Sequence, residues 1–398
     1  MAGLKRRQLL HAGAASALGV PLLARAAAPA ALRVWINGDK GWRGIGHAAG
    51  AFRQDTGVEV QVEHPEDAIA KFEQAAAAGK GPDVWIWPHD RLGSWASAGL
   101  ISAVTPSRAT RTAIDGLAWS AWQLQGRTWA FPLGMETVAL IHNRALAPQS
   151  PASWDEVHTL HRRLQPQGRQ AVRWWMTEVY YSWGLIAAGG GYAFARRADG
   201  SYDGHDTGIA TPGAVRSVET MLQLVHEGLL PRNVTYADAE AAVNEGRVAM
   251  TFNGPWAWAN LRKSGIRFGV APYPRIAGRP GGSFVGVLGA MVASGSRQRE
   301  LAHEFIEEYL LALPSLRAID ADVPLGVPAN KALYAERSTD PLSTGSMAAV
   351  RAGTLMPSNP EMTRFWTAMT AALQNIMQGR EGVQAGLERA AARIVGPA

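Results

Sequence analysis

Short apolar runs alternate with stretches of helical hydrophobic spacing along most of the chain. The apolar runs are bounded by Gly, Pro, Asn and Asp, which is the pattern of strands followed by turns. Seven of them are predicted as strands, over residues 32–36, 58–62, 84–87, 137–143, 171–175, 248–253 and 284–293. Strands that alternate with helices predict an α/β protein.

Four stretches between or after these strands carry helical signals. One helix follows a turn-rich loop over residues 37–41 and ends at Gly57. Residues 65–78 are predicted as a second helix, with Pro65 near its first position and Gly79 beyond its end. Residues 361–378 and 381–394 place apolar side chains at helical spacing.

The length of 398 residues indicates two or three domains. The composition is 47% hydrophobic and 18% charged, which is typical of a globular chain that buries a sizeable core. No repeat is present that would indicate a solenoid or a propeller.

The first 28 residues have the parts of an export signal. Lys5, Arg6 and Arg7 precede an apolar stretch over residues 12–23, and the small-residue run 24–28 supplies a cleavage site. The apolar stretch is too short to span a bilayer, which needs about 20 residues. The arginine pair favours the twin-arginine route, with an ordinary Sec signal as the alternative. Either route exports the protein.

Charge and cysteine content exclude several classes. Removing the four basic residues of the signal lowers the formal net charge from +6 to +2, and no Lys/Arg block remains, so nucleic acid is not an expected partner. The chain has no Cys, which excludes disulfides, thiolate metal sites and a lipidated Cys anchor. We therefore expect a monomer that is free in the periplasm.

Tryptophan is the strongest compositional signal, with 15 in the chain. Four are predicted to pack in the core: Trp35, Trp85, Trp119 and Trp129. Others stand beside polar residues in loops, and several of these loops follow strands, where open α/β sheets bind ligands. These groups lie at residues 87–91, 253–258 and 365–366, and residues 178–181 repeat the pattern with two tyrosines after a glutamate.

Aromatic side chains next to charged ones suit a sugar. A sugar ring has flat apolar faces rimmed by hydroxyl groups that donate and accept hydrogen bonds, so aromatic platforms with charged or amide groups at their edges hold it. Hydrogen bonds to charged groups contribute roughly 1.5–3 kcal/mol each. The sequence therefore predicts a sugar-binding site.

Longer sequence words extend this pattern. They are WINGDKG at 35–41, VEHP at 62–65, GPD at 81–83, HDR at 89–91, LIAA at 185–188, GGYAF at 190–194, NGPWAW at 253–258, FVGVL at 284–288 and the stretch 356–366. From about Arg33 to Ile394, the chain resembles the periplasmic maltose- and maltodextrin-binding proteins of bacterial ABC importers.

The resemblance implies a two-lobed periplasmic binding fold of type II, with discontinuous lobes joined by a hinge and a ligand cleft between them. The expected amino-terminal lobe covers residues 29–134 and 290–335. The expected carboxyl-terminal lobe covers residues 139–284 and 342–396. The partners that the resemblance implies are maltose, trehalose or a short maltodextrin, and an inner-membrane ABC permease with its ATPase.

The resemblance also implies which side chains contact the sugar. The expected contacts of the amino-terminal half are Asn37, Asp39, Lys40, Trp87, Asp90, Arg91 and Glu136. The expected contacts of the carboxyl-terminal half are Glu178, Tyr180, Trp256, Met356 and Trp366. No catalytic residue, cofactor or metal is expected.

Several positions depart from the family pattern. Ile69 and Ala70 replace two glutamates, Asp67 replaces a lysine, and Val179 replaces a proline. Thr367 and Thr370 stand where the family has an aromatic residue and an arginine. These changes remove partners of the more distant glucose units, so we predict a preference for a disaccharide over long maltodextrins.

Other functions fit the sequence less well. A glycoside hydrolase could use a carboxylate pair from Asp39, Asp90, Glu136 and Glu178, and this is the alternative function. The glycines after the first strand lack the G-x-G-x-x-G spacing of a nucleotide site. Asp199 and Asp203 imitate the start of a calcium loop, but Ala210 replaces its essential Glu, and a polar hairpin is the better interpretation. Polyamine or iron binding would not require so many tryptophans.

Overall fold

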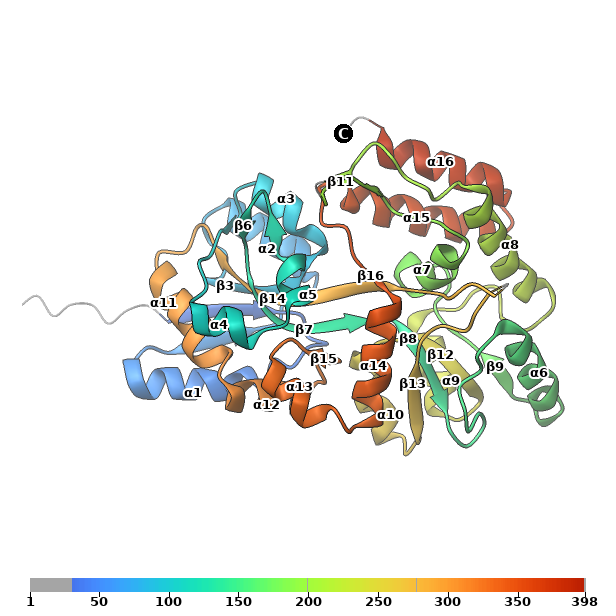
Figure 1. Cartoon of the computed structure of the whole chain (residues 1–398), viewed down its shortest axis with the longest axis horizontal. Helices are drawn as coiled ribbons and strands as arrows, with labels where there is room; N and C mark the ends of the chain where they lie inside the picture. Colours follow the sequence, from blue (N-terminus) through green and yellow to red (C-terminus); the bar gives the residue numbers. More distant parts are fainter. Residues whose placement is uncertain (1–30, 199, 277, 397–398) are drawn as a thin grey trace, which may run out of the picture.

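The computed structural model describes residues 31–198, 200–276 and 278–396, and the predicted export signal lies outside them. Two sheets with flanking helices form two halves of the molecule (Figure 1). We call the half around the eight-stranded sheet the first lobe and the half around the four-stranded sheet the second lobe. The predicted α/β class and the two-lobed architecture are confirmed.

The sheet of the first lobe has the order β15-β7-β14-β3-β1-β2, and β4 and β16 also pair with β14. The strands β1, β2 and β3 are parallel, whereas β3 and β7 run antiparallel to β14. The strands are β1 (Leu32–Ile36), β2 (Val60–Glu63), β3 (Val84–Pro88), β4 (Ile101–Ser102), β7 (Phe131–Thr137), β14 (Phe284–Ala293), β15 (Val327–Pro328) and β16 (Thr354–Leu355).

Helices cover this sheet. They are α1 (Ile45–Thr56), α2 (Ala68–Ala77), α3 (Leu92–Ser97), α4 (Arg108–Ala113), α5 (Gly116–Ala121), α11 (Arg299–Glu304), α12 (Leu313–Asp322) and α13 (Lys331–Arg337). A π-helical turn, Phe305–Leu310, follows α11 and packs on α1. A small hairpin, β5 (Gln123–Leu124) and β6 (Arg127–Thr128), lies beside them.

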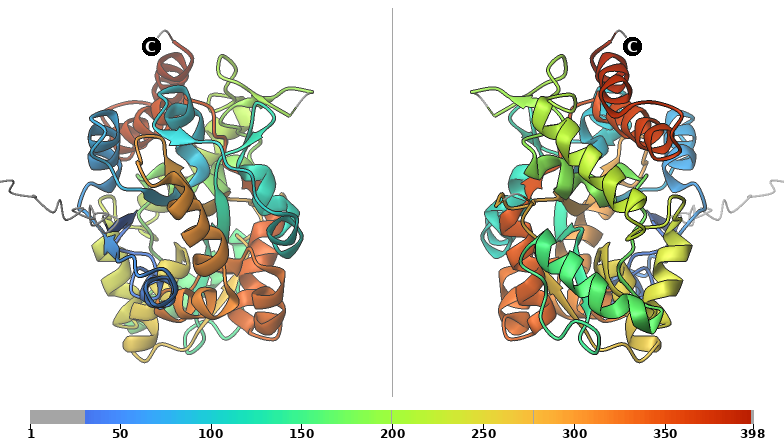
Figure 2. Two further views of the ribbon diagram at one scale, coloured as in Figure 1. Left: turned by 90° about the vertical axis from the view of Figure 1, so that its left-hand side faces the viewer. Right: turned by 90° about the vertical axis from the view of Figure 1, so that its right-hand side faces the viewer.

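The sheet of the second lobe has the order β13-β8-β12-β9. Its strands are β8 (Ala139–Asn143), β9 (Gln170–Val172), β12 (Val248–Asn253) and β13 (Phe268–Ala271). Its helices are α6 (Trp154–Leu164), α7 (Val179–Ala188), α8 (Pro212–His226), α9 (Tyr236–Asn244), α10 (Trp258–Lys263), α14 (Pro341–Ala352), α15 (Met362–Met377) and α16 (Val383–Val395). The hairpin of β10 (Ala195–Arg196) and β11 (Tyr202–Asp203) projects from this lobe (Figure 2).

The chain passes between the lobes three times. The first passage joins β7 to β8 through Val138, and the second joins β13 to β14. The third runs from α13 of the first lobe through α14 and β16 to α15 of the second lobe. All ten residues of β14 are buried, because this strand has neighbours on both edges and apolar packing on both faces. One core cluster surrounds the sheet of the first lobe, and two pack against the sheet of the second lobe. Phe284 at the start of β14 already belongs to the larger core cluster of the second lobe.

The strand predictions are accurate where apolar runs are uninterrupted. Three runs, 32–36, 248–253 and 284–293, have the predicted bounds. The run 137–143 is wrong as one strand, because Thr137 ends β7 and β8 begins at Ala139. Strand β7 was missed, since Pro132 and Gly134 weaken its pattern although they lie in the sheet. The strand β13 was also missed.

Three further predictions need correction. The helix predicted to begin at Pro65 begins at Ala68, because Asp67 adopts a left-handed conformation (φ 49°) that ends the turn before it. The predicted strand 58–62 is shifted to Val60–Glu63, and the strand predicted over 171–175 stops at Val172. The polar hairpin near Asp203 and the burial of Trp35, Trp85, Trp119 and Trp129 are confirmed.

Candidate functional site

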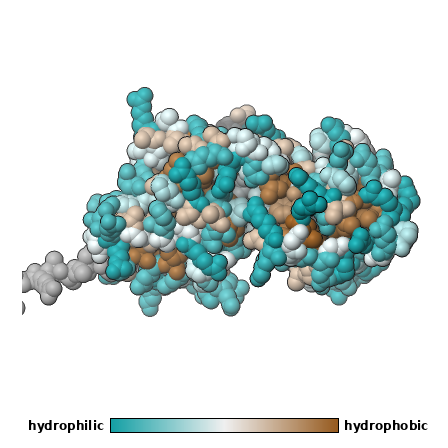
Figure 3. All heavy atoms as spheres, turned by 90° about the horizontal axis from the view of Figure 1, so that it is seen from below, coloured by the Kyte–Doolittle hydropathy of each residue, from teal (hydrophilic) through white to brown (hydrophobic). Residues whose placement is uncertain are grey.

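A cavity of about 290 Å³ lies between the two lobes. Its volume is just below the usual range of small-molecule sites, roughly 300–1,000 Å³. The surface is hollowed between the two halves of the face shown in Figure 3, which is otherwise mostly hydrophilic. All twelve predicted site residues line the cavity: Asn37, Asp39, Lys40, Trp87, Asp90, Arg91, Glu136, Glu178, Tyr180, Trp256, Met356 and Trp366.

A buried ion pair forms the floor of the site. Lys40, in the loop after β1, places its Nζ 2.7 Å from Oε2 of Glu136 on β7. Burial by itself lowers the pKa of Lys40, but the negative charges of Glu136 and Asp39 outweigh it and raise this pKa above its usual value. The same ammonium lies 4.7 Å from the ring centroid of Trp256, so Lys40 contacts the second lobe as well.

The turn after β3 supplies a carboxylate and a guanidinium. This 3₁₀ turn, His89–Arg91, places the Asp90 carboxylate where it accepts a hydrogen bond of 3.2 Å from Nε1 of Trp366 on α15. Burial raises the pKa of Asp90 to about 6, although Arg91 and the Trp366 bond act in the opposite direction. The pKa of Asp90 thus lies well above that of an ordinary aspartate.

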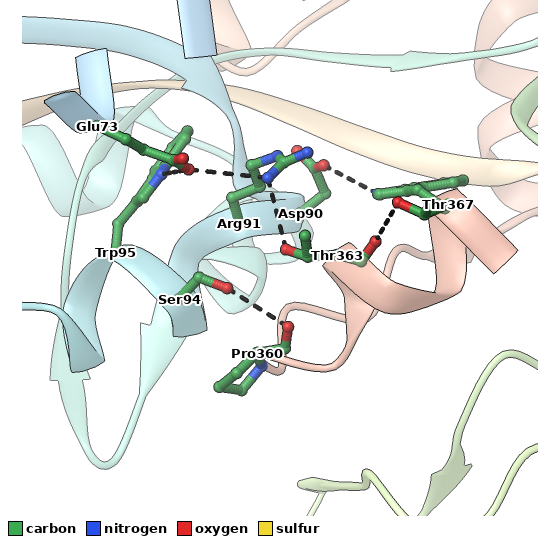
Figure 4. Close-up of polar contacts among 9 residues, drawn as sticks. Glu73, Asp90, Arg91, Ser94, Trp95, Pro360, Thr363 and Thr367 are labelled. Carbon is green, nitrogen blue, oxygen red and sulfur yellow. Dashed lines mark hydrogen bonds and ion pairs between the residues drawn. The ribbon is translucent and has the colours of Figure 1, made fainter. Parts of the chain in front are cut away.

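Arg91 links α2 to α15 across the edge of the cleft (Figure 4). One of its terminal nitrogens lies 3.7 Å from Glu73 and 3.5 Å from the hydroxyl of Thr363. Trp95 Nε1 donates to the same Glu73 at 2.9 Å, which holds this carboxylate toward the arginine. The contacts hold the turn of the first lobe against the first turn of α15.

Aromatic rings line the second-lobe side of the cavity in a continuous row. The ring centroids of successive members are 6.0 Å apart between Trp366 and Tyr180, 6.1 Å between Tyr180 and Trp256, and 6.4 Å between Trp256 and Tyr181. Tyr236 continues the row, 6.0 Å from Tyr181. We call these five residues the aromatic row.

The far end of the row lies near Asp39. Burial raises the pKa of Tyr236 to about 12 and also raises that of Tyr181, and the Asp39 carboxylate contributes to both shifts. Trp175, which is half-buried, lies 5.9 Å from Tyr181 and widens this end. The row thus extends from Asp90 to Asp39, along the charged side chains of the first lobe.

Trp87 and Glu178 are held in place by neighbours that lie outside the cavity. Trp87 stacks on the buried Trp85 with centroids 5.1 Å apart and planes 8° from parallel, so its position is fixed by the core of the first lobe. Glu178 precedes α7 and accepts a hydrogen bond from the hydroxyl of Thr370 at 3.3 Å. Burial raises the pKa of Glu178, and the Thr370 bond partly offsets the rise.

Sequence reasoning missed part of the lining. Ile69, Ile86, Pro88, Tyr181 and Leu288 also face the cavity. Tyr181 could have been found, because it directly follows the predicted Tyr180 in one of the aromatic groups. Ile86 and Leu288 carry no such signal, since they read as interior residues of strands.

This arrangement can bind and orient a polyhydroxylated ring. Rings offer apolar platforms along one side, and ionised groups offer donors and acceptors along the other. Among the described residues, no group of three or more His, Asp and Glu side chains could hold a metal ion. No helix in residues 31–198, 200–276 and 278–396 is long and apolar enough to cross a membrane.

The chain is similar in sequence to several known proteins. A galactooligosaccharide-binding protein of Bacillus subtilis is 27% identical over 90% of this chain and 87% of its own length. A maltotriose-binding protein of Pyrococcus abyssi is 26% identical over 81% of this chain and 71% of its own. A maltooligosaccharide ABC transporter solute-binding lipoprotein of Streptococcus pneumoniae is 24% identical over 86% of this chain and 83% of its own.

The family model of the bacterial extracellular solute-binding proteins matches residues 47–349, which is most of the chain. Proteins of this family bind solutes and do not transform them, so the alternative of a glycoside hydrolase is set aside. The fold, the interlobe cleft and the family match lead to one conclusion: this chain belongs to the bacterial extracellular solute-binding proteins.

Proposed function

We propose that the protein is the sugar-binding component of an ABC importer. It binds maltose or a related α-glucoside, including trehalose or a short maltodextrin, and delivers it to an inner-membrane permease with its ATPase. The observation that carries the proposal is the meeting of charged side chains from the first lobe and an aromatic row from the second in one cavity. The names of the oligosaccharide-binding relatives support the ligand class.

Both lobes contribute polar and apolar contacts, with most of the polar ones from the first lobe and most of the aromatic ones from the second. Asn37, Asp39, Lys40, Asp90 and Arg91 hydrogen-bond sugar hydroxyls, with Glu136 behind Lys40. Glu178 does the same from the second lobe. Trp87, Tyr180, Trp256 and Trp366 supply apolar faces, and Met356 closes the cavity at the third passage.

Closure without chemistry is the proposed mechanism. The lobes, at residues 29–134 plus 290–335 and at 139–284 plus 342–396, move as bodies about the three passages. A sugar that contacts both lobes favours the closed arrangement, because only that arrangement makes both sets of contacts. The closed form docks on the permease as a monomer in the periplasm, after export by the twin-arginine route.

Ligand length is the finer part of the proposal. Ile69 lies in the cavity wall, where an apolar side chain offers no hydrogen bond to a hydroxyl group, and Thr370 is engaged by Glu178. Neither side chain therefore offers a hydrogen bond to the more distant glucose units of a long maltodextrin. We therefore expect a disaccharide to bind at least as tightly as maltoheptaose, and calorimetry with both ligands measures this.

The test of the function is a fluorescence titration. The aromatic row includes two tryptophans, so a sugar in the cavity changes the intrinsic emission. Titration with maltose, trehalose, maltotriose and a galactooligosaccharide identifies the ligand, with ribose as the negative control. Absence of a saturable change with every oligosaccharide, confirmed by calorimetry, would overturn the proposal.

A further inference from the structure

Two strands from different parts of the chain share one edge of β14. Strand β3 pairs with β14 opposite Leu288 to Val292 and ends at Pro88. Strand β16, in the third passage between the lobes, pairs with the opposite end of β14 at Phe284 and Val285. Between the two partners, the backbone of β14 around Val287 has no strand beside it on this edge.

The side chain of His89 fills this interval. Met356 N–H donates to Val285 O at 3.1 Å, which is a normal rung of the parallel ladder of β14 and β16. In a regular parallel ladder, the next rung would run from Val287 N–H to Met356 O. Instead, Val287 N–H donates to Nδ1 of His89 at 3.0 Å, and Nε2 of His89 donates to Met356 O at 2.9 Å.

The partners fix the state of the ring. A backbone N–H can only donate and a backbone carbonyl can only accept, so Nδ1 is bare and Nε2 carries the proton. Burial lowers the pKa of His89 to about 4, so the ring is neutral at neutral pH. Its side chain is 1% exposed, and the ring of Trp122 lies edge-on to it at 6.2 Å.

The ring connects the hinge to the cleft. His89 immediately precedes Asp90 and Arg91, which line the cavity, and Met356 lines the same cavity from the third passage. The next residues of that passage are held by the same part of the first lobe, since Gly93 N–H donates to Ser358 O at 2.7 Å. A change in the separation of Met356 from β14 therefore moves a wall of the cavity.

We propose that His89 is a positioning residue whose imidazole is a spacer in the hinge, replacing one rung between β14 and Met356 and so setting the width of the cleft. Without the ring, Val287 and Met356 can form the direct rung and draw the third passage toward β14. The consequence for sugar affinity rests on the proposed function, whereas the spacing itself does not.

Three variants separate this role from ordinary packing. His89→Ala removes the spacer, and His89→Gln keeps one donor and one acceptor on neighbouring atoms. His142→Ala is the matched control, because His142 is also buried and bonds a backbone carbonyl, that of Ala147, but does not line the cavity. Each is titrated with maltose and with maltotriose, and checked for folding by circular dichroism.

We expect His89→Ala to weaken sugar binding about tenfold or more, and His89→Gln and His142→Ala to stay within about threefold of wild type. A crystal structure of His89→Ala should show Val287 N and Met356 O about 3 Å apart, as in a direct rung. An unchanged affinity of His89→Ala, an equal loss in His89→Gln, or an unchanged gap at Val287 would each overturn the proposal.

The design remains decisive if one part fails. If His89→Ala does not fold, the crystal structure of His89→Gln decides. The proposal then requires that the introduced amide bridges Val287 and Met356 and that sugar affinity is kept. If wild-type protein binds no sugar, the proposed function fails, and the crystal structures of the variants still test the spacer.

Discussion

At the scale of single residues, the site depends on side chains that are held by a partner before any ligand contact. Asp90 accepts the Trp366 N–H, Lys40 is paired with Glu136, and Trp87 rests on Trp85. Such preorganisation reduces the entropy lost when a ligand binds. Removing a ring from the aromatic row takes away an apolar platform for the sugar, so it should cost affinity and leave the fold unchanged.

Trp256→Ala and Trp366→Ala test the row. Each removes a half-buried ring that lines the cavity, and we expect sugar affinity to fall at least about tenfold. Fluorescence of the remaining tryptophans or calorimetry measures the affinity, and circular dichroism checks the fold. Tyr192→Ala is the control, because Tyr192 is an exposed aromatic outside the cavity. Wild-type affinity in both tryptophan variants would show that the row is not the platform.

Asp90 makes binding depend on pH. Its raised pKa of about 6 means that the folded form takes up a proton between pH 6 and 4, so Asp90 stabilises this conformation less as the pH rises through that window. Protonation removes the charge of the carboxylate, and hydrogen bonds to a charged acceptor are stronger than those to a neutral one. We expect sugar affinity to fall as the pH drops below 6 in wild type but not in Asp90→Asn, measured by calorimetry from pH 4.5 to 8. Parallel profiles of the two proteins would contradict this.

At the scale of elements, strand ends place the chemistry. The parallel strands β9 and β12 end at one edge of the second sheet, and the segments that follow carry Trp175 and Trp256. The helices then fix what the loops present, since α7 begins just after Glu178 and α15 carries Trp366. Two elements place the far end of the aromatic row near Asp39: α9 begins at Tyr236, and β9 is followed by Trp175.

Trp175 should matter most for longer ligands. It lies beyond Tyr181 at the Asp39 end of the row, outside the lining of the central cavity. We expect Trp175→Ala to weaken maltotriose binding several-fold more than maltose binding, because only the longer sugar reaches that ring. Competition titrations with the two sugars measure the ratio. An equal loss for both would place Trp175 in a purely supporting role.

At the scale of the whole molecule, contacts across the cleft decide the arrangement of the lobes. Lys40 with Trp256 and Asp90 with Trp366 join side chains from opposite lobes, while three passages of backbone allow them to separate. Surfaces joined by few contacts move relative to each other more readily than a large apolar interface does. A ligand that bridges them should shift this balance.

Small-angle X-ray scattering tests the movement. We expect the radius of gyration to decrease on addition of a saturating sugar and to stay unchanged with a sugar that does not bind in the fluorescence titration. Trp366→Ala, which loses the Asp90 contact, should need more sugar for the same decrease. A radius that does not change with bound sugar would show that binding occurs without closure.

The sequence by itself determined the class of the fold and the chemistry of the site. Uninterrupted apolar runs such as β14 and the terminal helices follow from local periodicity, and the aromatic and charged groups are visible as words in the chain. Contacts between distant segments are different, because local pattern carries no information on them. Only the tertiary structure decided that β7 is a strand despite Pro132 and Gly134, that Tyr236 continues the aromatic row, and that His89 stands between Val287 and Met356. Each depends on a neighbour more than 50 residues away in the chain, which supplies the packing or the hydrogen bond that local sequence lacks.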